Sequence, residues 1–150
     1  MKKTLLVLML LMPFVLSAQS KLYKGRSTYS SDVLYTFDGK YLYSGNSTYS
    51  SNTIYTFDGE RVYSGRSTFS TDVILRFDGR YVYQGNSCYS SDVICTFDGK
   101  HIYKGRSTYS SDILYTLDGR YIYNGSSTYS GNILYTLSGH IPIPILVMFL

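Results

Sequence analysis

The sequence predicts an all-β protein made of six tandem β-hairpin repeats of twenty residues, in either a compact closed array or an open solenoid. A twenty-residue unit recurs six times without insertion or deletion. Each unit has two short stretches rich in β-branched and aromatic residues, and no helical period is visible. An Asp-Gly pair, or Ser-Gly in the last unit, separates the two stretches and is typical of a hairpin turn.

Residues 1–18 have the pattern of an export signal. Two lysines precede an almost wholly apolar run over residues 4–16, and Ser17 and Ala18 are small residues suited to cleavage. The run is too short to anchor the chain in a bilayer. We therefore expect a cleaved signal peptide at residues 1–18 and an exported protein in the periplasm, at the cell surface or outside the cell.

The charge and the scarcity of some residue types limit the possible functions. Loss of the signal peptide removes two lysines from a formal net charge of only +4, so a nucleic-acid partner is not expected. The chain has two histidines and one glutamate, Glu60, and no sequence motif for zinc, phosphate or a nucleophilic serine. We expect no catalytic residues, no metal and no cofactor, because near-identical units also lack the unlike groups that one catalytic site needs.

The repeat domain is expected to span residues 19–140. Its units are residues 21–40, 41–60, 61–80, 81–100, 101–120 and 121–140. In the first hairpin, a type I turn with a bulge at Gly39 would pair Thr36 with Lys40 and place Leu34 and Leu42 on one aliphatic face. A two-residue turn would put these leucines on opposite faces, and we favour the bulged turn.

The loop between hairpins, residues 45–52 in the second unit, repeats its glycine, two serines and an aromatic ring in every unit. One interpretation is that Gly45 turns the chain while Ser47 and Ser50 bond backbone groups. The other is that these hydroxyls and rings bind a ligand. Both interpretations remain open from the sequence.

Odd and even units differ at their sixth position. It is arginine in odd units and Asn or Ser in even ones, and each arginine has an acid six residues later. The resulting pairs are Arg26 with Asp32, Arg66 with Asp72 and Arg106 with Asp112. The pattern predicts an ion pair that closes the loop of odd units, and it also fits triplication of a forty-residue pair of units.

Both cysteines fall in the fourth unit, Cys88 in place of a threonine and Cys95 in place of a tyrosine. Export to an oxidising compartment makes a local Cys88–Cys95 disulfide a reasonable hypothesis. Two free thiols are the alternative.

The last ten residues, 141–150, carry no polar side chain. The repeat register would make Ile141 and Ile143 part of a second strand in an incomplete seventh unit. We expect this segment to pack against aliphatic positions such as Leu22 and Leu34 and to close the array. Membrane contact through Ile145–Leu150 is the less favoured alternative.

Three known repeat families resemble these residues. The string YTFDGKYLYSG at residues 35–45 resembles the core of a MORN repeat, and the unit length and aromatic-Asp-Gly hairpin resemble choline-binding and related cell-wall repeats. The string IYTFDG at residues 54–59 resembles the hairpins of small exported proteins called four-fold beta flowers. We place this resemblance first because size and export signal agree with it, and it implies a compact, flower-like array.

We expect a non-enzymatic structural or interaction module of the cell envelope. The alternative is a module that binds a cell-surface glycan or the cell wall through tyrosine-rich surfaces, and another envelope protein is also a candidate partner. The tyrosines proposed for ligand binding are Tyr43, Tyr63, Tyr83, Tyr103 and Tyr123. A row of exposed rings at these positions would favour binding, and buried rings would favour a scaffold.

Overall fold

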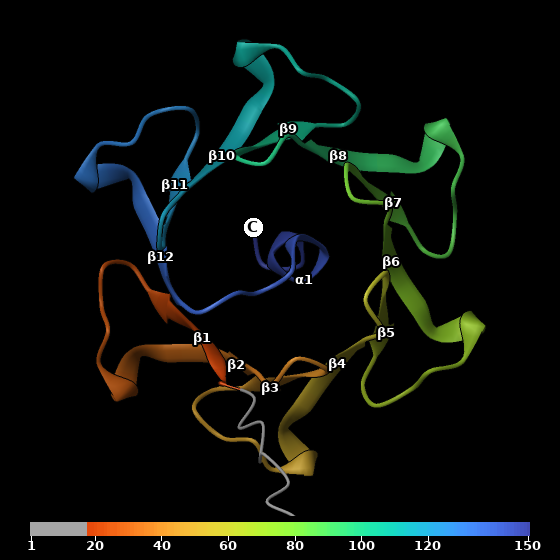
Figure 1. Ribbon diagram of the computed structural model, residues 1–150, viewed down its shortest axis with the longest axis vertical. Helices are drawn as coiled ribbons and strands as arrows, with labels where there is room; N and C mark the ends of the chain where they lie inside the picture. The colour runs from red at the N-terminus through yellow and green to blue at the C-terminus, as the bar shows by residue number, and fades with distance from the viewer. Residues whose placement is uncertain (1–17) are drawn as a thin grey trace, which may run out of the picture.

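The computed structural model describes residues 18–150, so the predicted signal peptide lies outside the described residues except for Ala18. Twelve antiparallel strands form a closed barrel, and they follow one another around the ring in chain order (Figure 1). Six loops project outward from the barrel, and we call them petals (Figure 1). They are residues 25–32, 45–52, 65–72, 85–92, 105–112 and 125–132. The predicted all-β hairpin repeats are therefore confirmed, in the closed rather than the solenoid form.

The strands are short and evenly distributed along the chain. They are β1 (Ser20–Lys24), β2 (Val33–Phe37), β3 (Tyr41–Ser44), β4 (Thr53–Phe57), β5 (Arg61–Ser64), β6 (Val73–Phe77), β7 (Tyr81–Gln84), β8 (Val93–Phe97), β9 (His101–Lys104), β10 (Ile113–Asp118), β11 (Tyr121–Asn124) and β12 (Ile133–Ser138). One 3₁₀ turn lies in each petal: η1 (Ser30–Asp32), η2 (Ser50–Asn52), η3 (Ser70–Asp72), η4 (Ser90–Asp92), η5 (Ser110–Asp112) and η6 (Ser130–Asn132). A single helix, α1 (Ile143–Val147), follows the last strand.

The hairpin register differs from the predicted one. Thr36 pairs with Tyr43, and Phe37 pairs with Leu42, so the turn is a tight one and the predicted bulged turn is wrong. The reason is the Asp38 side chain, whose Oδ1 accepts hydrogen bonds from the backbone N–H of Lys40 at 2.9 Å and of Tyr41 at 2.7 Å. These bonds fix the chain reversal while Gly39 takes a φ of 100°.

The predicted aliphatic face does not form, because the tight turn pairs Leu42 with Phe37 instead of Leu34, and a β-bulge lies at Leu34. Tyr35 pairs with Leu22 and Val33 pairs with Tyr23, so Leu34 is the extra residue between them. The barrel interior consequently holds Leu42 with Phe37 and Tyr35, and Leu34 is not part of the core cluster.

One aliphatic residue per unit forms the central layer of the core. Each is at most 1% exposed, and together they are Leu22, Leu42, Val62, Val82, Ile102 and Ile122. Helix α1 lies in the middle of the ring they form (Figure 1), where Ile145 and Leu146 are each 1% exposed. The apolar tail thus packs into the array, as expected, in the core cluster that contains Leu22, whereas Leu34, the other expected contact, is not in that cluster.

The tail is a helix instead of the expected strand of a seventh unit. Pro142 precedes the helix, and Pro144 lies in its first turn, where a missing N–H removes no hydrogen bond. The same prolines would have removed alternate donors from a strand. The Tyr115 hydroxyl donates to the carbonyl of Leu150 and ties the end of the tail to β10.

Pairing of the first strand with the last closes the barrel. Leu22 pairs with Leu137 and Tyr23 with Thr136, in the register that the hairpins use elsewhere. The Thr136 hydroxyl also donates to the carbonyl of Gly25 at 2.7 Å. Closure leaves no sheet edge in the barrel to pair with another chain.

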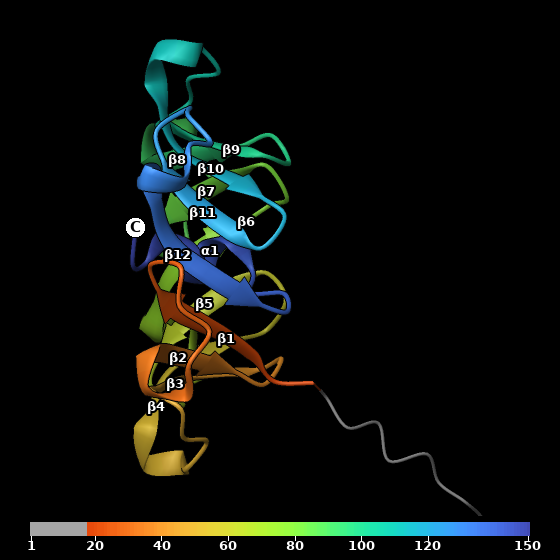
Figure 2. The same cartoon turned by 90° about the vertical axis from the view of Figure 1, so that its left-hand side faces the viewer.

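The ring has two different faces. In the side view, the hairpin turns project to one side, while the 3₁₀ turns and the C-terminus lie toward the other (Figure 2). Within residues 18–150, no helix has the length and apolar character needed to cross a membrane.

Candidate interaction site on the petal loops

Each petal presents one aromatic ring to solvent, directly before its 3₁₀ turn. We call these six residues the petal aromatics. They are Tyr29, Tyr49, Phe69, Tyr89, Tyr109 and Tyr129, and they are 73–81% exposed. Large aromatic side chains at such exposure are costly to keep in water, and the repeat places them at six equivalent positions.

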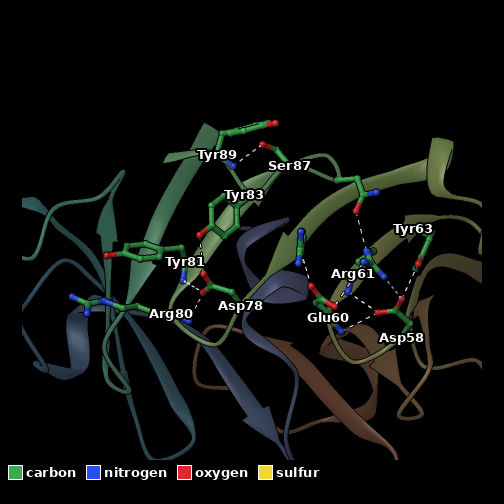
Figure 3. A network of polar contacts seen from close by, with 12 residues as sticks. Asp58, Glu60, Arg61, Tyr63, Asp78, Arg80, Tyr81, Tyr83, Ser87 and Tyr89 are labelled. Carbon is green, nitrogen blue, oxygen red and sulfur yellow. Dashed lines mark hydrogen bonds and ion pairs between the residues drawn. The ribbon is translucent and has the colours of Figure 1, made fainter. Parts of the chain in front are cut away.

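Hydrogen bonds hold the backbone of each petal aromatic on both sides, and Figure 3 draws the bond to Ser87 in the fourth unit. The N–H of Tyr89 donates to Ser87 Oγ at 3.1 Å, and its carbonyl accepts from the N–H of Asp92 at 3.0 Å. The Ser87 hydroxyl in turn donates to the Asp92 carboxylate. The same two backbone bonds recur in all six petals, so each exposed ring stands on a fixed turn.

The petal is also fastened to the barrel wall. In five units a fully buried threonine donates to a glycine carbonyl at the start of the petal, at 2.7–2.8 Å. The pairs are Thr36 with Gly45, Thr56 with Gly65, Thr96 with Gly105, Thr116 with Gly125 and Thr136 with Gly25. Of the roles predicted for the loop, the structure bears out the turn at Gly45, with φ 69°, and the backbone bond to Ser47.

The tyrosines proposed from sequence lie elsewhere and are buried. Tyr43, Tyr63, Tyr83, Tyr103 and Tyr123 are only 5–8% exposed. Four of them pair with a threonine and Tyr83 pairs with Arg76, on the side of the barrel wall that faces away from the core, beneath the petals. Their rings therefore do not form the exposed row that stacking on sugars needs. Buried rings at these positions favour a scaffold role.

Four of these buried tyrosines complete a hydrogen-bond network at the hairpin turn. At the turn between the third and fourth units, the Tyr83 hydroxyl donates to Asp78 Oδ2 at 2.8 Å (Figure 3). Desolvation alone would raise the pKa of Asp78, but the N–H groups of Tyr81 and Arg80 and the Tyr83 hydroxyl hold that pKa below its usual value. The bond to this carboxylate and partial burial raise the pKa of Tyr83. Although burial opposes this, the pKa values of Asp38, Asp58 and Asp98 are likewise lowered by hydrogen bonds to their carboxylates.

The arginines of odd units do not form the predicted loop ion pairs. Among the described residues no salt bridge joins Arg66 to Asp72, because the Asp72 carboxylate is occupied by the Ser67 hydroxyl. Arg66 instead lies over the Tyr41 ring of the preceding unit, with its guanidinium carbon 4.1 Å from the ring centre. Two equivalent residues, Arg106 and Tyr81, repeat the contact at 5.2 Å.

The contact from an even unit to the next odd unit therefore differs from the contact between an odd unit and the next even one. At the interface after an odd unit, the basic residue Arg61 donates from Nε to the side-chain oxygen of Asn86 at 2.9 Å. Arginine at the position of Asn86 would bring two cations together. The asparagine of the even unit thus avoids this repulsion at the Arg61–Asn86 contact.

The single glutamate, Glu60, compensates the positive charge of two arginines in the third unit. Arg61 and Arg76 are directly opposite each other on β5 and β6, and Arg76 replaces the threonine found in the other units. Glu60 Oε1 lies 2.5 Å from Arg76 Nε, and Oε2 lies 3.9 Å from a terminal nitrogen of Arg61. Like charges on opposed strand positions repel, so Glu60 compensates for this substitution.

The two cysteines are free thiols, and the predicted disulfide is absent. Cys95 is 2% exposed and belongs to the core cluster, whereas Cys88 is exposed in a petal loop. The threonine and tyrosine that they replace belong to different environments, outside and inside the barrel. Burial raises the pKa of the Cys95 thiol to about 12. Within residues 18–150 no group of three or more His, Cys, Asp and Glu residues is arranged to hold a metal.

A family comparison agrees with this geometry. The family described as 6-fold beta flower protein has a sequence model that matches residues 22–146. The chain belongs to the 6-fold beta flower family. No curated protein and no solved structure matches the sequence.

The resemblance to beta flowers drawn from the hairpins is therefore confirmed, with six petals rather than four. The comparisons give no support to the MORN and choline-binding resemblances. The sequence of this beta flower shows a recurring ring in the loops, but the binding site predicted from it, the Tyr43 row, lies elsewhere. The signal that distinguishes the petal aromatics is their setting, since each is a lone ring within a run of Ser and Thr, outside both strands.

Proposed function

We propose that this 6-fold beta flower is an exported, non-enzymatic interaction module of the cell envelope, which engages its partner through the petal aromatics. The observation that carries the proposal is the set of six rings at 73–81% exposure, each on a backbone turn that is fixed by two hydrogen bonds. Because the turns are already ordered, binding would require little further loss of backbone freedom. The closed barrel then serves as a rigid support.

Six equivalent sites favour a partner that is itself repetitive. A single ring offers a small contact area and weak affinity, but several rings engaged at once gain from high effective concentration. A cell-surface glycan is a repetitive partner whose sugar C–H groups pack on aromatic faces. Phe69 retains the face without the hydroxyl, so the shared element of the six sites is the ring. Another envelope protein is the second candidate partner.

The test compares the mature protein with a sixfold variant in which every petal aromatic is changed to serine. The matched control changes the exposed serine that follows each aromatic to alanine, at Ser30, Ser50, Ser70, Ser90, Ser110 and Ser130. Binding is measured on a glycan array and to isolated cell envelopes. We expect the aromatic variant to lose at least tenfold in apparent affinity, with its melting temperature unchanged, while the control binds normally.

Two results separate the candidate partners. Binding to array glycans supports the glycan, and binding only to envelopes in a protease-sensitive manner supports a protein. Equal binding by the aromatic variant and the mature protein would overturn the role of the petals.

A further inference from the structure

One inward-facing position, which holds a tyrosine ring in most units, carries side chains of different size in the six units. Four units have tyrosine there, namely Tyr35, Tyr55, Tyr115 and Tyr135, whereas the third has Leu75 and the fourth has Cys95. Cysteine is the smallest of these side chains. The fourth unit therefore fills less of the space between the barrel wall and the C-terminal tail than the others do.

A pocket of about 170 Å³ lies at this place. Cys95 and Ile102 line it from the barrel wall, and Val147 and Leu150 line it from the tail. Ile94 and Leu114 also line the pocket, and their side chains are 41% and 38% exposed. Both side chains line the pocket and are also in contact with solvent, so the pocket opens to solvent beside them.

The lining selects an uncharged ligand. It contains no charged side chain, and the hydroxyl of Tyr115, which also borders the pocket, is already bonded to the Leu150 carbonyl. The Cys95 thiol is neutral at physiological pH because burial raises its pKa. Apolar cavities of about 150 Å³ in proteins remain dry and bind benzene, so the present volume is sufficient for a group of that size.

We propose that the pocket beside Cys95 binds a small hydrocarbon group of about six carbon atoms, as a ring or as the end of an alkyl chain. The exposed rim of Ile94 and Leu114 leaves room for a larger molecule to insert such a group from outside. The site is distinct from the petal aromatics, and its existence does not depend on the function proposed for them.

Titration with benzene and, separately, with 1-hexanol tests this proposal, followed by the methyl NMR signals of Ile94, Leu114 and Val147. We expect saturable shifts of these signals with at least one probe. The decisive variant is Cys95→Tyr, which introduces the residue that four other units accommodate at this position. It should lower the affinity at least tenfold. Cys88→Thr, which restores the residue of the other units at an exposed site, is the matched control and should bind as the unchanged protein does.

A second variant protects the test against a folding defect. If Cys95→Tyr fails to fold, Cys95→Leu introduces the residue found in the third unit and fills part of the same space. It should weaken probe binding in the same direction. The proposal is overturned if neither probe gives saturable shifts, or if the filled, folded variants bind as strongly as the unchanged protein.

Discussion

The guanidinium of Arg66 lies 4.1 Å from the centre of the Tyr41 ring, a contact between neighbouring units. Arg66 also donates to the Thr53 hydroxyl at 3.1 Å, which orients the guanidinium over the ring. Because arginine occurs at this position only in odd units and tyrosine at the facing position only in even ones, the ring of six units has a three-fold pattern of interfaces.

The first prediction concerns this contact. A double-mutant cycle with Arg66→Asn and Tyr41→Leu should give a favourable coupling free energy of about 0.5–1 kcal/mol in chemical unfolding. The cycle with Arg66→Asn and Asp72→Asn is the control, and its coupling should be near zero because the two side chains form no ion pair. A larger coupling to Asp72 than to Tyr41 would contradict the structure.

The second prediction concerns the tail. Leu146→Ala should lower the free energy of unfolding by about 2–5 kcal/mol, since it leaves a cavity in the centre of the barrel. Leu146 is 1% exposed, whereas Val147 is half-buried, so Val147→Ala should cost distinctly less. Urea unfolding of both variants measures the difference. Equal, small effects would show that the barrel is stable without its central helix.

The third prediction concerns the two thiols. In the folded protein one thiol, Cys88, should react rapidly with a thiol reagent, and Cys95 should react only when the protein is unfolded. The reason is that Cys95 is buried and its raised pKa of about 12 keeps the reactive thiolate scarce. The Cys88→Thr variant should lose the rapid phase. Absence of any reactive thiol before reduction would instead mean that the cysteines are bonded.

The fourth prediction concerns acid. The pKa values of Asp38, Asp58, Asp78 and Asp98 are lower in the folded protein than in the unfolded chain. The stability they contribute is therefore fully present above the unfolded pKa, about 3.9, and is lost as the pH falls through the lower folded values.

A variant with all four aspartates changed to asparagine tests that link. It should be less stable at neutral pH, and its stability should depend less on pH below about 4. Melting temperatures measured across this range provide the comparison. An equally steep acid dependence in the variant would assign the effect to other carboxylates.

The sequence by itself determined the local architecture of this protein. An unbroken twenty-residue period with β-branched and aromatic stretches specifies short strands, because these side chains fit a pleated sheet. Asp-Gly specifies the turn between them, and the uniformly apolar tail has to be buried. These expectations depend on neighbours in the chain, and they were correct.

Tertiary structure decided the register, the closure and the exposure of the rings. Two turn geometries were available to Asp38-Gly39, and the one adopted pairs Phe37 with Leu42, which are both buried in the core of the closed barrel. Tyr43 and Tyr49 are equally aromatic in sequence, yet one lies beneath a petal and the other at its tip. Cys88 and Cys95 lie seven residues apart but in different environments, because Cys88 is in an exposed petal loop whereas Cys95 is in β8 and belongs to the core cluster. Which face becomes the interior is settled only when β1 pairs with β12 around the central helix.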